Sequence, residues 1–251
     1  MTFQNYLNPT IEPVSADILA AADQSPFSPD QFISIEQARE LETPGYVQVE
    51  NGYCLNSDGS VSVVALTDMP GVTPAMWHWW FGWHGDSDEK YKLWHPLAHI
   101  SAEWADKEIG RLAYINRTSI VVEYIGKPKT AAAIQFKSPT VLGLPEFDPE
   151  TSDAVYIVAR LGAPRPAIDV GWLIHQVRKT AIGSEMRSRF WLGGDHFAGR
   201  NRFGNLLVPL ARRFQKIGAE QAEALLFHCA EEMNHLAKFC LLYTSPSPRD
   251  S

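Results

Sequence analysis

The order of the secondary-structure signals constrains this chain most, because strand-like segments come first and one long amphipathic helix comes last. Segments rich in Val, Ile and Tyr and bounded by Gly, Pro, Asn or Asp are typical of β-strands. We expect strands at residues 60–65, 111–115, 119–125, 131–136 and 154–160, a strand leading into a loop at 168–173, and helices at 35–41, 208–216 and 219–239. Antiparallel strands followed by a long terminal helix predict an α+β fold.

Three regions of different composition divide the 251 residues. Residues 1–52 are rich in Pro, Asp and Ser and are predicted to form an N-terminal lead-in segment. Residues 53–239 contain most of the strand and helix signals, including a hairpin turn at Asp58 and Gly59, and are predicted to form the main domain. Residues 240–251 are dense in Ser and Pro and resemble translated vector sequence, so we expect a non-native tail there.

The charge balance and the apolar pattern argue against two classes of partner. The chain has 22 Lys and Arg against 29 Asp and Glu, a formal net charge of −7, so it has no basic field to attract a phosphate backbone. No segment approaches the roughly 18 consecutive apolar residues of a membrane span, and the N-terminus does not resemble a signal peptide. Three cysteines are too few for a disulfide framework. We therefore expect a cytoplasmic protein with no nucleic-acid or membrane partner.

Six of the eight tryptophans lie in residues 77–104, together with four histidines. The residues concerned are Trp77, Trp79, Trp80, Trp83, Trp94 and Trp104, with His78, His84, His95 and His99. Such a cluster indicates either a cavity with aromatic walls or an aromatic core or oligomer contact.

The terminal helix carries a polar pair beside its apolar face. On a helical wheel Glu232 borders the apolar arc that contains Leu225, whereas Glu231 points away from it. His228 lies four residues before Glu232, so both side chains project from one helix face and one metal ion can bridge them. Imidazole nitrogen and carboxylate oxygen are ligands that zinc accepts. The alternative is an ordinary His/Glu pair near solvent.

Further ligands must come from elsewhere in the chain. Glu123 lies in an otherwise apolar predicted strand, where alternation places it on one face with Val121 and Ile125. A carboxylate among aliphatic neighbours needs a partner, unless the strand is an edge strand and the side chain reaches solvent. The four clustered histidines are the other candidates.

Six short motifs, in this order, resemble those of the 2,4-diacetylphloroglucinol hydrolases and their relatives, the phloretin hydrolases. They are WWFGWH at residues 79–84, YKLWHPLAH at 91–99, VEYIG at 122–126, HQVR at 175–178, GSEMRSRFWLG at 183–193 and HCAEE at 228–232. The resemblance carried by these motifs covers roughly residues 71–239, which is most of the chain.

The resemblance implies a zinc-dependent hydrolase that cleaves the carbon–carbon bond between a polyhydroxylated aromatic ring and its acyl group. It also implies a catalytic domain with the helix-grip fold of birch pollen allergen and START-like proteins, in which an antiparallel sheet curls round a long terminal helix. The implied zinc ligands are His99, Glu123, His228 and Glu232. His175 is implied to act on the substrate, an acylated phenol, and Tyr91 to hydrogen-bond it.

Several alternatives stay open at this point. His95 is a rival to His99 as the first ligand; otherwise we expect His95 to help orient ring hydroxyls in catalysis. A helix-grip protein can bind apolar ligands without catalysis, and two His with carboxylates also suit the iron of a non-haem oxygenase. A purely structural metal site is a third alternative. A homodimer is a further expectation.

Overall fold

The computed structural model describes residue 7 and residues 10–214 and 217–243. The strands are β1 (Gly52–Leu55), β2 (Ser60–Pro70), β3 (His99–Trp104), β4 (Thr118–Tyr124), β5 (Lys129–Lys137), β6 (Ala154–Ala163), β7 (Ile168–Thr180), β8 (Gly183–Gly193) and β9 (Ala198–Gly199). The α-helices are α1 (Ala16–Gln24), α2 (Pro74–Trp83), α3 (Asp88–Trp94), α4 (Arg202–Phe214) and α5 (Ala219–Tyr243). Short 3₁₀ helices are η2 (Pro29–Gln31), η3 (Ile35–Glu42), η4 (His84–Asp86), η5 (Pro139–Leu142) and η6 (Gly194–His196).

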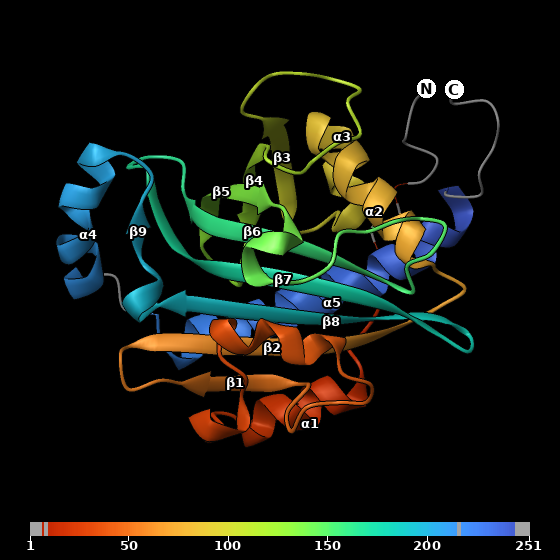
Figure 1. Cartoon of the computed structure of the whole chain (residues 1–251), viewed down its shortest axis with the longest axis horizontal. Coiled ribbons are helices and arrows are strands. Elements are labelled where there is room, and N and C mark those ends of the chain that lie inside the picture. Colours follow the sequence, from red (N-terminus) through yellow and green to blue (C-terminus); the bar gives the residue numbers. More distant parts are fainter. Residues whose placement is uncertain (1–6, 8–9, 215–216, 244–251) are drawn as a thin grey trace.

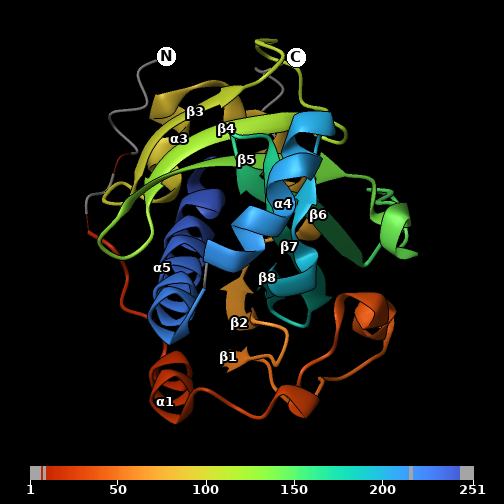
Figure 2. The same cartoon turned by 90° about the vertical axis from the view of Figure 1, so that its left-hand side faces the viewer.

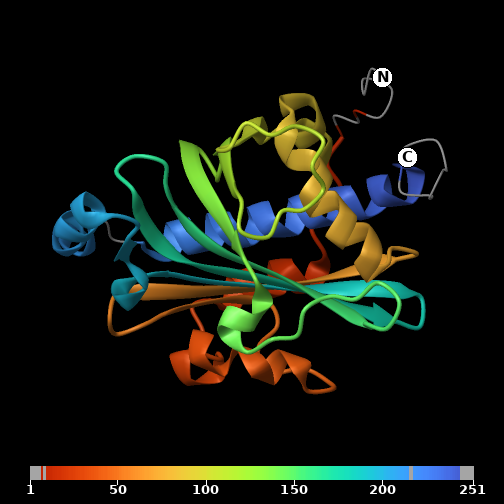
Figure 3. The same cartoon turned by 45° about the horizontal axis from the view of Figure 1, so that its top comes forward.

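One antiparallel sheet organises the molecule (Figure 1). Its strand order is β1-β2-β8-β7-β6-β5-β4-β3, and β9 pairs with β7. The strands curve around α5, which lies along the inner face of the sheet (Figure 2). Helix α3 packs against β3 and near one end of α5, and α2 packs against β6 and β7 (Figure 3). The predicted α+β class is confirmed.

The inner face of the sheet and the apolar face of α5 form the main core. Leu226, Met233 and Leu236 of α5 are fully buried, as the helical wheel predicts. On β4 the residues facing α5 are Ser119, Val121 and Glu123, which alternate with half-buried neighbours. This alternation places the Glu123 carboxylate inside the molecule rather than at a solvent-facing edge.

The outer face of the sheet is covered by the N-terminal segment. Ile35, Ala38 and Leu41 of η3 pack against sheet residues that include Val158 and Trp191. The predicted helix at residues 35–41 is therefore present, as a 3₁₀ helix. The described structure does not test the predicted boundaries at residues 52 and 239, and residues 244–251 of the expected tail lie outside the described residues.

The strand predicted at residues 111–115 is wrong, because this segment is a loop between β3 and β4. Arg117 explains the loop: its guanidinium donates to the carbonyl oxygens of Glu108 at 2.8 Å and Arg111 at 3.0 Å. A side chain thus occupies acceptors that a neighbouring strand would otherwise use. Other strands are present but extend further than expected; β7, for example, continues to Thr180.

The same loop packs closely against α2 at Gly82. A Cβ atom at this position would lie 1.7 Å from the carbonyl oxygen of Leu112. We therefore expect Gly82→Ala to lower the free energy of unfolding by about 1–3 kcal/mol, because α2 and the loop must separate. Thermal denaturation checks this, and an unchanged melting temperature would contradict the close packing of α2 against the loop.

Helix α4 packs against β9 and β7, at the end of the sheet away from α2 and α3 (Figure 1). It begins earlier, at Arg202, than the helix predicted at residues 208–216, of which residues 215–216 lie outside the described residues. Four large apolar side chains of α4 are exposed: Phe203, Leu206, Leu210 and Phe214.

Among the described helices, none combines the length and apolarity that crossing a bilayer requires.

Candidate active site

A cavity of about 720 Å³ lies between the inner face of the sheet and α5. Its walls are mostly apolar: Val121, Ile134, Phe136, Leu173, Phe190 and Phe227 are among the lining residues. Polar groups in the lining include Glu123, His175, His228 and Glu232. An apolar cavity with a few convergent polar groups is the usual form of a small-molecule site.

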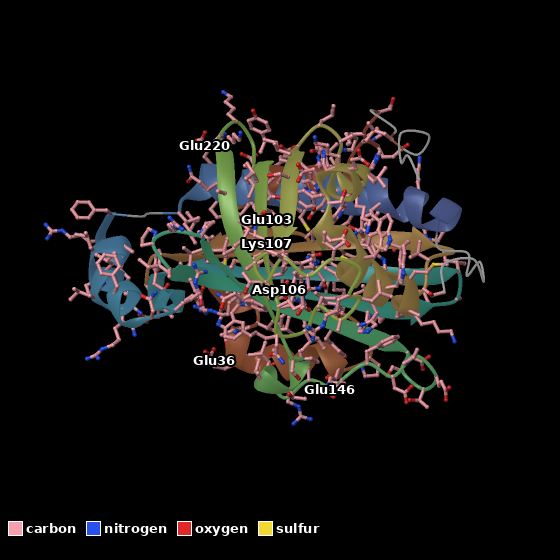
Figure 4. The ribbon with its side chains drawn as sticks, turned by 90° about the horizontal axis from the view of Figure 1, so that it is seen from above. Glu36, Glu103, Asp106, Lys107, Glu146 and Glu220 are labelled. Atoms are coloured by element: carbon pink, nitrogen blue, oxygen red, sulfur yellow. The ribbon has the colours of Figure 1, made fainter. Side chains whose placement is uncertain are left out.

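The turn between β4 and β5 and the first turns of α5 line the exposed part of this cavity. Lys127, in the turn between β4 and β5, lines it together with Glu220 and Glu223 of α5. Figure 4 shows Glu220 projecting at the start of α5, whereas Glu103, Asp106 and Lys107 lie around the end of β3. Gly126 in the turn has a φ of 65°, and a Cβ there would lie 3.1 Å from the Cβ of Ala224, so glycine permits this close approach.

Two His and two Glu side chains converge at the inner end. The pairing of β3 with β4 sets His99 directly opposite Glu123, and α5 supplies His228 and Glu232 one turn apart. His99 Nε2 lies 3.5 Å from Glu123 Oε2 and 3.4 Å from Glu232 Oε2. His228 Nε2 lies 3.6 Å and 3.8 Å from the same two oxygen atoms.

The hydrogen bonding of His99 suits this cluster to a cation. His99 Nδ1 lies 3.0 Å from the carbonyl oxygen of Tyr91, which can only accept, so Nδ1 carries the proton. In the neutral ring Nε2 then presents a lone pair, and it is buried with no hydrogen-bond partner in the described structure. Ligand atoms of His99, His228 and Glu232 lie within 4.8 Å of one another. This donor set fits zinc or iron.

The four groups perturb one another strongly. Burial raises the pKa of Glu123, but His228 and His99 outweigh this effect and lower it to about 2. Burial, with the charge of Glu123, raises the pKa of Glu232 to about 8 despite His228. For His228, burial lowers the pKa, but Glu123 and Glu232 outweigh it and raise it to about 9. Metal-free protein at neutral pH therefore carries protons on His228 and Glu232.

Metal binding is consequently expected to release between one and two protons at neutral pH, since both groups must lose their protons to act as ligands. Raising the pH removes these protons, so zinc affinity should increase from about pH 6 to about pH 8. Titration calorimetry in buffers of different ionisation enthalpy measures the release. An affinity independent of pH would show that His228 and Glu232 do not bind the ion.

Tyr91 and His95 occupy different places around this cluster. Tyr91 donates a hydrogen bond from its hydroxyl to Glu123, and its ring stacks on His99 with centroids 3.8 Å apart. His95 Nδ1 accepts from the Ala98 amide at 3.2 Å, which leaves Nε2 to donate to Glu231 at 3.3 Å. Both ring nitrogens of His95 are therefore engaged outside the cluster, and His95 is not among the cavity-lining residues.

His175 lines the cavity from β7. Its Nδ1 lies 2.7 Å from the hydroxyl of Ser188 on β8, and burial lowers its pKa to about 3. The ring is therefore neutral at physiological pH. Because a serine hydroxyl can either accept or donate, His175 can hold its proton on either nitrogen.

The tryptophan cluster contributes both to the cavity wall and to the aromatic core. Trp94 is the one member that lines the cavity in the described structure, whereas Trp77, Trp80 and Trp104 are buried in the core beside it. His84 also lines the cavity, with 3% of its surface exposed. Sequence reasoning placed His84 in the cluster but assigned it no role, because its position at the end of α2 has no periodic signal.

The fold and the site together define an α+β protein with an apolar cavity that ends at a buried His/Glu cluster. A family model described as the DAPG hydrolase PhiG domain matches residues 32–243. The chain belongs to this hydrolase family.

Individual relatives agree with the family. The chain is 29% identical over 224 residues to 2,4-diacetylphloroglucinol hydrolase of Pseudomonas protegens, covering 82% of this chain and 71% of the relative. It is 26% identical over 204 residues to phloretin hydrolase of Eubacterium ramulus, covering 77% of this chain and 73% of the relative.

Solved structures give weaker similarities. Protein Ms6760 from Mycobacterium smegmatis aligns with a TM-score of 0.33 and 10% identity, over 78% of this chain and 98% of that one. A protein from Arthrobacter aurescens aligns with a TM-score of 0.29 and 15% identity, over 69% of this chain and 86% of that one. At these scores the similarities carry no argument about fold or function.

Proposed function

We propose that this chain is a zinc-dependent hydrolase that cleaves the carbon–carbon bond between a phloroglucinol-type ring and its acyl group. The observation that carries this proposal is the cluster of His99, Glu123, His228 and Glu232 at the inner end of an apolar cavity, in a chain of the DAPG hydrolase family. The names of its relatives specify acylated phenols as substrates. The cavity volume is sufficient for an aromatic ring of this size.

The four side chains of the cluster would hold the zinc ion. His99 is the first ligand in this proposal because its Nε2 is buried and unpaired in the described structure, whereas His95 is engaged with Glu231. Zinc supplies Lewis acidity, which polarises a carbonyl group or acidifies water near neutral pH. His99 is covered by protein, while Glu123, His228 and Glu232 line the cavity, so the site is open on the cavity side.

The reaction adds water to the acyl carbon and breaks its bond to the ring. The electron pair of that bond goes to the ring carbon, and ring hydroxyls ortho and para to the acyl group stabilise it as an enolate. The proton that the added water loses goes to the ring carbon, and Nε2 of His175 can transfer it because Nδ1 is occupied by Ser188. Tyr91 orients Glu123 by donating a hydrogen bond to it, and because Tyr91 lines the cavity its hydroxyl can also accept a hydrogen bond from the substrate. The products are the deacylated phenol and a carboxylic acid.

The apolar walls contribute by excluding water and holding the flat ring. Phe136 and Phe190 line the cavity. Phe81 lines it as well, and its ring contacts the rings of both His84 and His175. A substrate confined there is desolvated, which strengthens its interactions with the polar groups at the inner end.

The curvature of the sheet around α5 supports assigning the fold to the helix-grip class, which is part of the same proposal. Membership of a hydrolase family favours catalysis over simple ligand binding. A homodimer and a cytoplasmic location stay predictions. Light scattering of the purified protein measures the first, and fractionation of the source cells measures the second.

Elemental analysis of purified protein, coupled to an assay of acetate release from 2,4-diacetylphloroglucinol, tests the proposal. We expect about one zinc per chain and acetate release that chelation abolishes and zinc restores. Iron with oxygen consumption would indicate the oxygenase alternative. Metal whose removal lowers only the melting temperature would indicate a structural site, and ligand binding without metal would indicate a binding protein.

A further inference from the structure

His84 is held rigidly in the cavity wall at the end of α2. Its ring stacks on Trp80 with centroids 5.5 Å apart and an interplanar angle of 13°. Trp94 meets it edge-on, at 5.0 Å and 77°. With these contacts the imidazole cannot rotate freely, so the direction in which each nitrogen points is set by the packing.

The two nitrogen atoms of His84 have different roles. Nδ1 lies 2.8 Å from the carbonyl oxygen of Trp80, which only accepts, so Nδ1 carries the proton. Nε2 is then an acceptor, and no donor in the described structure hydrogen-bonds it. Burial lowers the pKa of His84 to about 4, which keeps the ring neutral at physiological pH. The cavity wall thus contains an acceptor that lacks a donor.

The position of His84 brings this acceptor close to the proposed reaction centre. Its ring centroid lies 6.0 Å from that of Tyr91, which donates to Glu123. Phe81 links it to His175, with centroid distances of 5.7 Å to His84 and 5.8 Å to His175. A ring bound against Phe81 would therefore have polar groups on both sides.

We propose that Nε2 of His84 accepts a hydrogen bond from a hydroxyl of the aromatic substrate and selects rings that carry a free hydroxyl at that position. This inference rests on the proposed function. A hydroxyl satisfies the acceptor, whereas a methyl ether cannot donate and leaves Nε2 desolvated and unpaired. Because the His84 ring is neutral, it does not require a negative charge on the ligand, and the neutral phenol is recognised.

Two substitutions separate the structural role of His84 from its role toward the ligand. In His84→Asn the amide NH₂ reaches the position of Nδ1 and keeps the bond to Trp80, but nothing replaces Nε2. In His84→Gln the longer side chain places an amide oxygen near the position of Nε2. The probes are 2,4-diacetylphloroglucinol and its two mono-O-methyl ethers. Tryptophan fluorescence gives Kd with chelated protein, and acetate release gives kcat and KM with zinc-loaded protein.

We expect the unaltered protein to bind the parent compound about tenfold more tightly than at least one ether, the loss that one hydrogen bond of ordinary strength predicts. His84→Asn should weaken binding of the parent until this ratio approaches one, with KM changed more than kcat. His84→Gln should restore part of the ratio.

Three results would overturn the inference. The first is an unaltered protein that cleaves the parent but binds it and both ethers equally, which leaves the proposed function standing. The second is a folded His84→Asn protein with the full ratio. The third is an unaltered protein that neither binds nor cleaves the parent, which removes the proposed function as well. Should His84→Asn fail to fold, the ether ratio of the unaltered protein and its retention in His84→Gln decide the matter.

Discussion

Replacing His228 with alanine is expected to abolish metal binding and reduce acetate release by about a thousandfold or more. His228 is buried, and its Nε2 faces both Glu123 and Glu232. Without it the cluster keeps one imidazole and two carboxylates, a weaker donor set from which the positive partner of Glu123 is missing. Zinc content by elemental analysis and acetate release measure the two effects.

His235→Gln is the matched control for this variant. His235 is also a buried histidine of α5, but it is not part of the cluster. We expect the zinc content of the His235→Gln variant to equal that of the unaltered protein. Full activity in His228→Ala would rule out the proposed metal centre, and equal losses in both variants would indicate damage to α5 rather than to the site.

Glu232→Gln should lose most activity, by about a hundredfold or more, whereas Glu231→Gln should stay within about twofold of the unaltered protein. The two residues are adjacent, so a general disturbance of α5 affects both alike. Glu232 lies within the cluster at 7% exposure, and the Glu231 side chain is 41% exposed and contacts only His95 among the described hydrogen bonds. Glutamine has nearly the same shape as glutamate but lacks the negative charge that favours a cation.

Acetate release and zinc content of the pair are compared at one pH and one zinc concentration. A loss in Glu231→Gln as severe as that in Glu232→Gln would show that the helical-wheel assignment of the two carboxylates is wrong. Retention of zinc by Glu232→Gln with loss of activity would move Glu232 from metal binding to another role in the reaction.

Local periodicity predicted the helices and strands that pack on the core mainly through one face. The apolar arc of α5 and the alternation of β4 are both visible in the sequence because each repeats every turn or every second residue. From these two patterns alone, Glu232 is expected at the border of the core and Glu123 among aliphatic neighbours. Both expectations agree with their burial in the structure.

Strand β8 shows why other elements were missed. Its outward-facing residues Arg187 and Arg189 are almost fully buried, and both donate to Glu50 at 2.6 Å. Charged residues in a segment suggest solvent exposure, and here the partner that permits their burial comes from the N-terminal segment more than 130 residues away. No local pattern contains that information. The false strand at residues 111–115 has the same origin, since Arg117 satisfies carbonyl groups of the loop.

The sequence by itself determined the class of fold, the polar pair on α5 and the chemical types of the candidate ligands, because each depends on composition or on short-range spacing. Only the tertiary structure favours His99 over His95 as a candidate metal ligand. The register of β3 against β4 sets His99 opposite Glu123, while the hydrogen bonds of His95 direct it toward Ala98 and Glu231. Register and ring orientation arise from contacts between distant segments, so the identity of the groups that face the cavity, including His84, emerges only when the sheet closes around α5.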